Sequence, residues 1–459
     1  MTGNISQFFT GIDYLLSLPI ILLTLFALGI LLIDLMIPTE WKWTNAVTAF
    51  VGIAFSAAGV LKIQYALDQA HLSGQQAFMG SMVVDHFAIY FWYLFLAGAA
   101  ISILVSVRYL EIEHEHHGEF YSLLLFSVVG MMVMASGFDV VLIFIGLELM
   151  AISTYVLVGF LRTDRRSNEA ALKYLLLGAF SSGIFAYGLS LFYGLTGSTN
   201  LSAIQQRLSR EIALNGGKIG PVAILALLTV STGLLFKIAA IPFHQWLPDA
   251  YEGAPTSVTG FMSVAVKAAA WAMLLRILLW GLYPLRTVYV PLVVFVSIAT
   301  MTGANLAALT QNNLKRLLAY SSIAHVGYML LGLVVVEPCR RLIEMGFSLV
   351  ATRGTGVYLT SAGLPVEEVN KVLEGRPHIV DQMLSGEVQL IFNTTEGAQA
   401  IADSFSLRRT ALTIGIPYYT TVAGARAAVQ AIAALRAGSL EVASLQSYFV
   451  GSTGAPPAR

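Results

Sequence analysis

Three ionisable residues lie far inside long apolar stretches of the sequence. Glu148 lies in the middle of "DVVLIFIGLELMAISTYVLVGFL", Lys237 near the end of "VAILALLTVSTGLLFKIAAIPFH", and Lys267 in the middle of "TSVTGFMSVAVKAAAWAMLLRILL". A charge in mid-bilayer costs at least ~2.5–3.5 kcal/mol on insertion scales. Each of the three is therefore a candidate functional group.

The chemistry open to such residues is proton transfer. A buried amine and a buried carboxyl each favour their neutral forms, and proximity restores both charges. A pair can therefore hold or release a proton when one partner moves. Snorkelling to the interface is the alternative for Lys237, about one turn from a helix end; it is weaker for Glu148 and Lys267, each about ten residues from either end.

Further polar residues extend this series. His325 lies in "LLAYSSIAHVGYMLLG", where an imidazole that titrates near neutrality can relay protons between lysines. A histidine hydrogen-bonded to a neighbouring serine or a backbone carbonyl is an equally good interpretation. We interpret Lys173, near a predicted helix end, as a snorkelling lysine, and Asp34 as interfacial.

A broken segment separates the two lysines. The stretch "AIPFHQWLPDAYEGAPT", residues 240–256, contains Pro242, Pro248 and Pro255, which interrupt any continuous helix. Irregular backbone at membrane depth is tolerated where protein or water satisfies it, and transporters place ion sites there. We therefore expect this segment and its two flanking lysines to form one functional unit.

Composition places most of the chain in a membrane. Of the 459 residues, 57% are hydrophobic and only 11% are charged, which excludes an ordinary soluble protein. Lysine plus arginine and aspartate plus glutamate both number 26, so no net charge points to nucleic acid. The single cysteine, Cys339, excludes an internal disulfide and a cysteine-based metal cluster.

Apolar runs long enough to span a bilayer recur about ten times. Short loops rich in lysine and arginine, such as 162–166 and 315–316, fall at odd-numbered connections, which predicts an outside N-terminus. The stretch 197–219, with Arg207, Arg210 and Lys218, opposes this orientation. The predicted spans are 15–37, 45–66, 86–107, 120–136, 139–161, 171–195, 220–241, 256–282, 287–309 and 317–336.

The pattern changes after Pro338. From Arg340 to Leu435 no run spans a bilayer, and short β-type runs such as "VQLIFNTTEG" alternate with helical ones such as "ARAAVQAIAAL". This alternation predicts a small α/β domain. We expect domains at 1–336 and 340–436, followed by a tail at 437–459 that is disordered at its end.

The first part resembles subunit N of the proton-pumping NADH:quinone oxidoreductase, complex I, an antiporter-like membrane subunit. The carrying segments include "FIGLELMAISTYVLVGF", "FKIAAIPFHQWLPDAYEGAPTSVTGFMSVAVKAA" and "LTQNNLKRLLAYSSIAHVGYMLLGL". The resemblance implies that Glu148 and Lys237 form the charged pair of a half-channel and that Lys267 passes the proton onward. The family has about fourteen spans in two inverted repeats, and the resemblance ends near Val336.

The second part resembles the C-terminal allosteric domain of the large subunit of carbamoyl-phosphate synthase, a methylglyoxal-synthase-like fold. The carrying segments are "LVATRGT", "VNKVLEGRPHIVD", "LIFNTTEG" and "RRTALTIGIPYYTTVAGARAAVQAIAAL". The catalytic halves of that synthase have no counterpart here, nor does the aspartate segment of a methylglyoxal synthase. Membrane sequence also replaces the first strand of the domain.

The sequence of this second part predicts a phosphate-binding site. Thr352 and Thr355 flank a strand-to-helix turn, and amides at a helix N-terminus can hold a phosphate. Lys371 supplies a point charge, and the second strand end carries Asn393, Thr394 and Thr395. The resemblance implies a nucleotide monophosphate effector; taken singly, each threonine is as well explained as a helix cap.

We therefore expect a multi-pass subunit of the bacterial inner membrane that translocates protons while quinone is reduced elsewhere. The resemblance implies other complex I membrane subunits as partners. It also implies that other subunits of the complex bind NADH, flavin, iron–sulfur clusters and quinone and that this chain carries no cofactor. A stand-alone cation/proton antiporter and a membrane-anchored, effector-binding regulatory module stay open. We interpret the chain as a chimera and expect residues 340–459 to bind no effector in this context.

Overall fold

A computed structural model gives the fold, and it describes a chain of two compact units, Met1–Leu330 and Leu331–Arg459. The described residues are 10–113, 115, 117–361, 363–371, 374–393, 398–419 and 422–436.

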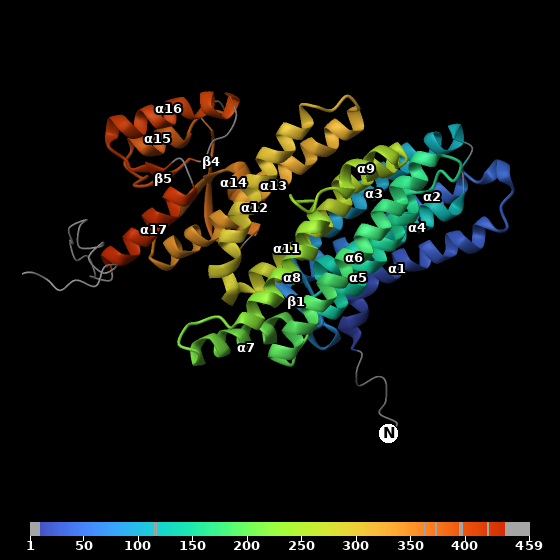
Figure 1. Cartoon of the computed structure of the whole chain (residues 1–459), viewed down its shortest axis with the longest axis horizontal. Coiled ribbons are helices and arrows are strands. Elements are labelled where there is room, and N and C mark those ends of the chain that lie inside the picture. The colour runs from blue at the N-terminus through green and yellow to red at the C-terminus, as the bar shows by residue number, and fades with distance from the viewer. Residues whose placement is uncertain are drawn as a thin grey trace, which may run out of the picture. The chain divides into compact units, whose positions relative to one another are not determined.

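The first unit is built mainly of helices (Figure 1), and the last of them, α13, extends past its boundary at Leu330. Helices α1 to α6 and α8 run alongside one another, and the shorter α7 lies at one end. The helices are α1 (Gly11–Asp34), α2 (Thr44–Gln69), α3 (His86–Ile112), α4 (Gly118–Ser136), α5 (Val140–Val158), α6 (Arg165–Thr196), α7 (Leu201–Leu214), α8 (Pro221–Ile238), α9 (Trp246–Gly253), α10 (Thr256–Phe261), α11 (Lys267–Leu275), α12 (Arg286–Ala308) and α13 (Leu314–Glu344).

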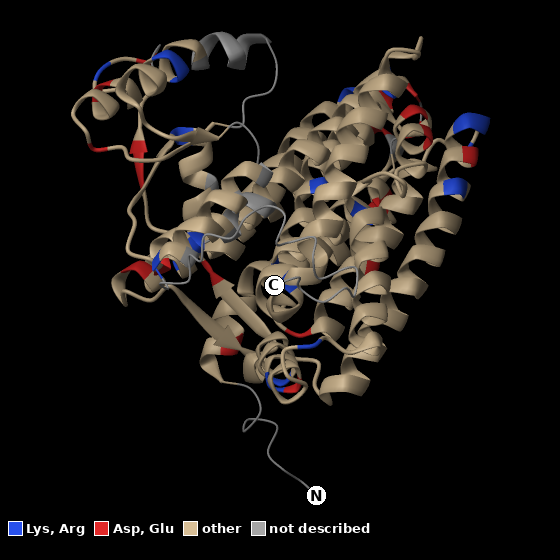
Figure 2. Ribbon diagram, turned by 60° about the vertical axis from the view of Figure 1, so that its left-hand side comes forward, with Lys and Arg blue, Asp and Glu red and all other residues tan. Residues whose placement is uncertain are grey.

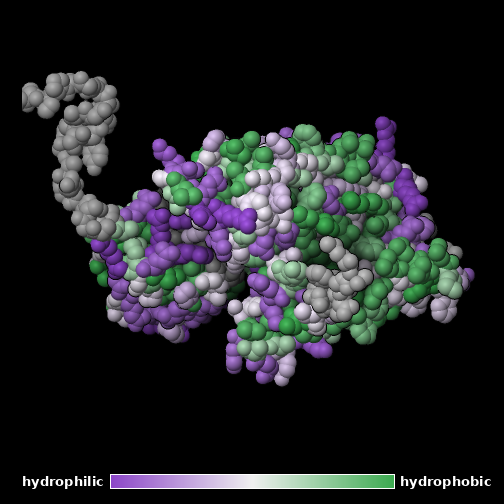
Figure 3. All heavy atoms as spheres, turned by 90° about the horizontal axis from the view of Figure 1, so that it is seen from below, coloured by the Kyte–Doolittle hydropathy of each residue, from purple (hydrophilic) through white to green (hydrophobic). Residues whose placement is uncertain are grey.

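The described part of the chain contains ten helices long and apolar enough to cross a membrane. They correspond one by one to the ten predicted apolar runs, so the predicted all-helical membrane architecture is confirmed. Hydrophobic side chains cover much of the visible surface of these helices, shown in green in Figure 3. Such a surface suits lipid as solvent, since only an apolar exterior is stable there.

Short polar side chains begin several of these helices. Asp85, Asp139 and Asp164 accept hydrogen bonds from backbone amides in the first turns of α3, α5 and α6. Thr10 and Asp13 form a capping box at the start of α1, and Asn200 caps α7. Each cap satisfies amides that the helix itself leaves unpaired.

Glycines allow the helices that carry the candidate site to approach closely. A Cβ atom added to Gly130 of α4 would lie 2.6 Å from the backbone oxygen of Gly146 on α5. A Cβ atom on Gly233 of α8 would lie 2.5 Å from Phe185 Cβ on α6. Such contacts are typical of membrane helices, which associate through close packing. They fix α5 and α8, the helices that carry Glu148 and Lys237.

A β-hairpin connects α2 and α3. Strands β1 (Gly74–Ala77) and β2 (Met82–Asp85) pair antiparallel around the short turn 78–81. The Phe78 amide donates to Asp13 Oδ1 at 2.6 Å, and Asn200 Nδ2 donates to the Gly80 oxygen at 2.9 Å. The hairpin therefore ties the start of α1 to the start of α7.

The span that carries Lys267 is not a uniform α-helix. It consists of α10, the π-helical segment η4 (Met262–Val266), α11, and a second π-helical segment η5 (Arg276–Gly281). Lys267 is the first residue after η4. Insertions of this kind often lie at functional sites because they re-aim the side chains that follow them.

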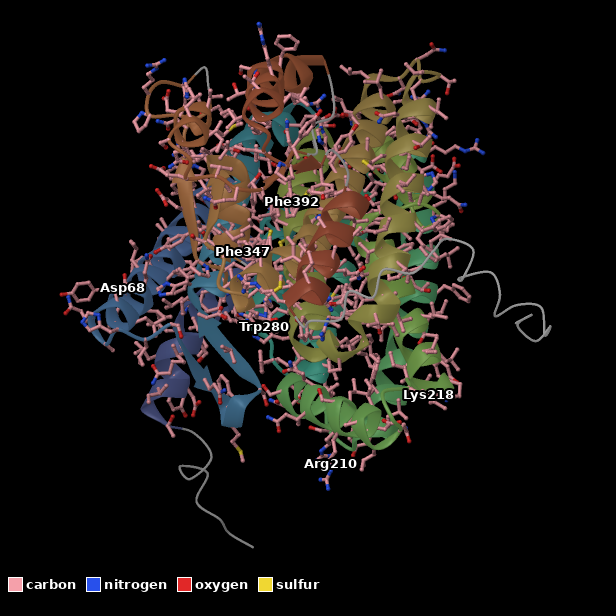
Figure 4. All side chains as sticks on the ribbon, turned by 90° about the vertical axis from the view of Figure 1, so that its left-hand side faces the viewer. Asp68, Arg210, Lys218, Trp280, Phe347 and Phe392 are labelled. Atoms are coloured by element: carbon pink, nitrogen blue, oxygen red, sulfur yellow. The ribbon has the colours of Figure 1, made fainter. Side chains whose placement is uncertain are left out.

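The stretch 197–219, which opposes the predicted orientation, forms the amphipathic helix α7 and the loop that follows it. Leu201, Ile204 and Leu208 of α7 are buried. Arg210 and Lys218 point away from the bundle at this end (Figure 4). These charges therefore belong to a surface helix and its loop rather than to a simple connection between spans, and the orientation itself stays a prediction.

The tenth predicted span extends further than expected. The sequence predicted an end near residue 336, but α13 continues through Pro338 to Glu344. Cys339 is buried against Leu359 and Leu364, and Ile343 packs against the same cluster. The helix persists past the proline because its last turns supply part of the core of the second unit.

The second unit combines short strands with helices, as predicted for an α/β domain. Strands β3 and β4 pair parallel, as do β5 and β6, but the two pairs form separate sheets rather than one open sheet. A second buried cluster contains Met383, Ile391 and Ala411. The elements are β3 (Leu349–Thr352), α14 (Arg353–Ser361), β4 (Val366–Val369), α15 (Ile379–Leu384), β5 (Ile391–Phe392), α16 (Ala398–Ile414), β6 (Tyr418–Tyr419) and α17 (Val422–Arg436).

Candidate functional site

Lys237 lies in the last turn of α8 and is only 5% exposed. Its Nζ donates a hydrogen bond of 3.4 Å to the hydroxyl oxygen of Tyr155 on α5. The same atom lies 5.6 Å from the centre of the Tyr155 ring and 6.0 Å from that of Phe236, which permits cation–π attraction. Lys237 therefore does not snorkel but lies in a largely aromatic pocket.

Glu148 lies on α5 seven residues before Tyr155, so both side chains are on one face of the helix. Its carboxylate interacts electrostatically with Lys237 and Tyr155. No ion pair within 4.0 Å joins Glu148 to Lys237, and Glu148 Oε1 is buried with no hydrogen-bond partner among the described residues. The predicted pair thus lies within electrostatic range but not in contact.

Stacked aromatic rings connect the Lys237 pocket to α9. Tyr174 of α6 packs edge-on against Tyr155 at 4.5 Å and stacks on Trp246 of α9 at 4.4 Å. Trp246 also stacks on Phe236 at 5.5 Å, and its Nε1 donates to the Phe236 oxygen at 2.9 Å. The position of α9 is therefore fixed directly against the residue that precedes Lys237.

Lys267 is 8% exposed and lies at the start of α11. Its Nζ donates to Ser322 Oγ at 2.5 Å and to the Ser322 backbone oxygen at 3.1 Å, both on α13. No ion pair of Lys267 occurs within the described parts of the chain. Like Lys237, this lysine is held by neutral oxygen atoms.

His325 shares a face of α13 with Ser322, three residues earlier. The His325 side chain is exposed, and its ring lies 5.6 Å from that of Tyr328 in an edge-on contact. Its predicted role as a proton relay stays a prediction, since its one described contact is aromatic.

The predicted broken segment is irregular where the prolines indicated. Ala239 adopts a left-handed conformation with φ of 59°, which ends α8 directly after Ile238. The Ile241 amide donates to Thr300 Oγ1 on α12 at 3.1 Å. His244 Nδ1 is buried without a partner among described residues, and burial lowers the pKa of His244. The neutral imidazole is therefore favoured there.

A cluster of charges that the sequence did not reveal surrounds α9. Arg316 Nη1 donates to Asp249 Oδ1 at 2.6 Å and to Glu252 Oε2 at 2.9 Å. Lys173 of α6 pairs with Asp249 at 3.1 Å and with Glu169 at 2.8 Å. The interpretation of Lys173 as a snorkelling lysine was incomplete, because it bridges two helices. Figure 2 shows the charged residues of the chain in blue and red.

Burial and the neighbouring cations act on the pKa of Asp249 in opposite directions. Burial acts to raise the pKa of Asp249, but the hydrogen bonds from Arg316 and Lys173 outweigh it and leave that pKa below its ordinary value. Asp249 is therefore ionised at neutral pH. The spacing of Asp249 and Glu252, three residues apart on a predicted helix, was the signal that could have indicated a shared partner.

A buried arginine was also missed. Arg276 of η5 is 1% exposed and binds both carboxylate oxygens of Asp85, at 2.8 and 2.6 Å. Its Nε donates to the Ala135 oxygen at 3.0 Å. The signal was present in the sequence, since Arg276 interrupts the same apolar run as Lys267 and every ionisable residue in a span is a candidate.

The predicted effector residues lie at strand ends, as expected. Thr352 ends β3, Thr355 is exposed in the first turn of α14, and Lys371 is exposed after β4. Asn393 follows β5, and its Nδ2 is buried without a partner among described residues. Because the two sheets are separate, these positions do not share one sheet edge. Thr394 and Thr395 lie outside the described residues.

Two parts of the chain match models of known protein families. Residues 137–351 match the family model described as NADH:quinone oxidoreductase/Mrp antiporter, TM, and residues 334–420 match that of the MGS-like domain. The helical unit thus has an antiporter-like fold, and the chain joins it to an MGS-like domain.

Individual relatives make the resemblance more specific. NADH-quinone oxidoreductase subunit N 1 of Koribacter versatilis is 64% identical over 328 residues, covering 71% of this chain and 64% of that protein. Subunit N 2 of Solibacter usitatus is 51% identical, with 72% and 66% covered. The chain resembles NADH-quinone oxidoreductase subunit N, and it spans a little less than two thirds of the length of these relatives.

Solved structures agree with this assignment. A chain of respiratory complex I from Thermus thermophilus with bound aureothin aligns with a TM-score of 0.56 and 34% identity, covering 69% of this chain and 64% of that one. A chain of the archaeal membrane-bound sulfane sulfur reductase aligns with a TM-score of 0.58 at 20% identity, covering 92% of this chain and 86% of that one. The second likeness shows the fold alone.

Proposed function

We propose that the helical unit translocates protons as a membrane subunit of an NADH:quinone oxidoreductase. The observation that carries this proposal is the environment of its two buried lysines. Lys237 and Lys267 are each almost fully buried, and each donates to neutral oxygen atoms rather than to a carboxylate. A lysine held in this way can bind and release a proton without breaking a salt bridge.

Glu148 supplies the control that such a lysine needs. Burial disfavours a charged ammonium, whereas a carboxylate nearby favours it. Because Glu148 interacts with Lys237 without touching it, protonation or movement of Glu148 changes the proton occupancy of Lys237. His325, exposed on the helix that holds Ser322, is the proposed relay of protons between lysines.

The energy for this movement comes from elsewhere in the assembly. We propose that other membrane subunits of complex I are the partners, in the bacterial inner membrane, and that NADH, flavin, iron–sulfur clusters and quinone are bound by other subunits. The identity to subunit N proteins supports this arrangement. In the second unit, the separate sheets support the proposal that no nucleotide effector binds.

A stand-alone cation/proton antiporter is the second candidate. The family model that matches residues 137–351 covers Mrp antiporters as well as the oxidoreductase. The same buried lysines would serve either protein, so fold alone does not separate the two.

Purification of the tagged full chain from its own membranes tests the proposal. We expect it to co-purify with NADH:quinone oxidoreductase activity. In inverted membrane vesicles that contain the assembly, we expect added NADH to acidify the interior without a requirement for sodium. A chain that purifies alone and exchanges sodium for protons without NADH would instead establish the antiporter.

A further inference from the structure

The Arg316 cluster joins the two lysine sites. Arg316 lies on α13 and holds Asp249 and Glu252 of α9 with a single nitrogen atom, at 2.6 and 2.9 Å. Six residues after Arg316, Ser322 of α13 accepts the hydrogen bond of Lys267. Three residues before Asp249, Trp246 of α9 packs on the residue next to Lys237. Each helix thus connects the cluster to a different lysine.

On the basis of the proposed function, we propose that Arg316 is a positioning residue that couples the Lys237 and Lys267 sites by clamping α9 to α13.

Further contacts hold α9 between α13 and α6. Lys315 Nζ donates to the Ala254 oxygen at 2.9 Å, and Asn313 Nδ2 donates to Glu252 Oε1 at 3.2 Å. On the opposite side, Gly253 packs so closely on α6 that an added Cβ atom would lie 2.5 Å from Ala170 Cβ. The C-terminal end of this short helix is therefore held between α6 and α13, and its first residue, Trp246, is held beside Lys237.

The aromatic contacts would transmit a displacement of α9 to the surroundings of Lys237. Trp246 and Tyr174 are 3% and 1% exposed, and their stacked rings leave no solvent layer to absorb a shift. Tyr174 packs on Tyr155, whose hydroxyl accepts from Lys237. Packed interiors transmit such displacements because they deform little. Spatial connection alone does not demonstrate coupling, so the test measures the coupling itself.

A double-mutant cycle in the full chain, in its own membranes, measures the coupling between the Lys237 and Lys267 sites. Tyr155→Phe removes the acceptor of Lys237, and Ser322→Ala removes the hydroxyl acceptor of Lys267. We expect their effects on proton translocation to be non-additive, by roughly 5-fold or more, while Arg316 is present. In the Arg316→Gln background the same effects become additive.

Arg162→Gln is the matched control. Arg162 forms an ion pair of 3.1 Å with Glu119, and both side chains are largely exposed. We expect this variant to keep the basal rate and the non-additivity. Non-additivity that survives Arg316→Gln, or that is lost equally in Arg162→Gln, would overturn the proposal.

The pH profile separates positioning from mere stability. The charged groups around Asp249 are Lys173 and Glu169 of α6 and Arg316 of α13, which also holds Glu252 of α9. Lys315 of α13 interacts with Glu252 and with Asp164, which caps α6. Without the Arg316 hydrogen bond the pKa of Asp249 rises. Since the clamp needs ionised Asp249, protonation of Asp249 releases it in the wild type and lowers translocation on the acid side of the pH profile. Arg316→Gln, which has no clamp to release, should lose this acid limb, Arg316→Lys should keep part of it, and Asp249→Asn with Arg316→Gln should behave like Arg316→Gln alone. An acid limb that is retained in Arg316→Gln contradicts the proposal.

Hydrogen exchange keeps the clamp testable even if the proposed function fails. In the purified full chain, amides of residues 246–253 should exchange at least several-fold faster in Arg316→Gln than in the wild type or in Arg162→Gln. Faster exchange in a chain that translocates no protons supports the clamp and rejects the function. Unchanged exchange rejects the clamp, whatever the wild-type chain does.

Discussion

The two units hold their polar groups in different ways. In the helical unit, Lys237, Lys267 and Arg276 are nearly fully buried, and each has hydrogen-bond partners on other helices or, for Arg276, also on strand β2. In the second unit, Thr355 and Lys371 are exposed beside strands of only four residues. Burial fixes a side chain and makes its protonation depend on its neighbours, whereas exposure leaves both to solvent.

This contrast indicates where the chain can perform chemistry. Lysines in a low-dielectric interior respond strongly to one nearby carboxylate, since Coulomb interactions strengthen as the dielectric constant falls. In the second unit, Thr355 and Lys371 are exposed and Thr352 and Asn393 belong to different sheets of the described residues, so we expect no convergent phosphate site there. We therefore expect substitutions in the helical unit to have large effects and those in the second unit to have small ones.

The largest effect should come from the Glu148 and Lys237 pair. Lys237→Ala removes the proposed proton carrier, and Glu148→Gln removes the charge proposed to control it, so we expect each to lower proton translocation at least about 10-fold. Translocation and subunit abundance are measured together in membrane vesicles. Glu111→Gln, which alters an exposed carboxylate paired with Arg108, is the control. Normal translocation at normal abundance in the first two variants would exclude the pair from the mechanism.

Lys267→Arg tests whether the second lysine must lose its proton. Arginine stays protonated in proteins, so it preserves charge but cannot act as a relay. We expect Lys267→Arg to lower translocation about as much as Lys267→Ala does. The control is Lys62→Arg, on an exposed position of α2. If arginine at position 267 sustains full translocation, Lys267 is a fixed charge.

Sequence patterns predicted the helices of the first unit well, because a run of about 20 apolar residues has few other uses. Lys237 and Lys267 were predictable for the same reason, as charges inside such runs. The bridge from Arg316 to Asp249 was not, because it depends on how α9 and α13 approach, and no local periodicity records that.

The end of α13 and the two separate sheets were also not predictable from local sequence patterns. A proline in a helix normally ends it, yet α13 passes Pro338 because Cys339 and Ile343 contribute to the core of the second unit. Strands β5 and β6 contain two residues each, too few to show a period of two. Tertiary packing decided both features.

A smaller effect is expected where packing alone shapes the site. An added Cβ atom at Gly178 of α6 would lie 2.7 Å from Tyr155 Cζ and displace the hydroxyl that Lys237 contacts. We expect Gly178→Ala to cost about 1–3 kcal/mol of stability and to lower translocation a few-fold. Gly183→Ala, on the same helix with nothing within 4 Å of the added atom, should be neutral or stabilising. Equal behaviour of the two variants would show that the Tyr155 position is unimportant.

The smallest effect should be the response of the second unit to nucleotides. Thr352 ends β3, Asn393 follows β5 in a different sheet of the described residues, and Lys371 is exposed. A phosphate bound there would meet isolated donors rather than a convergent set, so charge-assisted hydrogen bonds cannot add up. Calorimetric titration of the purified full chain with uridine and inosine monophosphates should show no saturable heat up to about millimolar concentration. Lys371→Ala should be indistinguishable from the wild type in this titration. Saturable micromolar binding that Lys371→Ala abolishes, together with a reporter fused after Leu435 that faces the cytoplasm, would instead make the second unit a working effector domain.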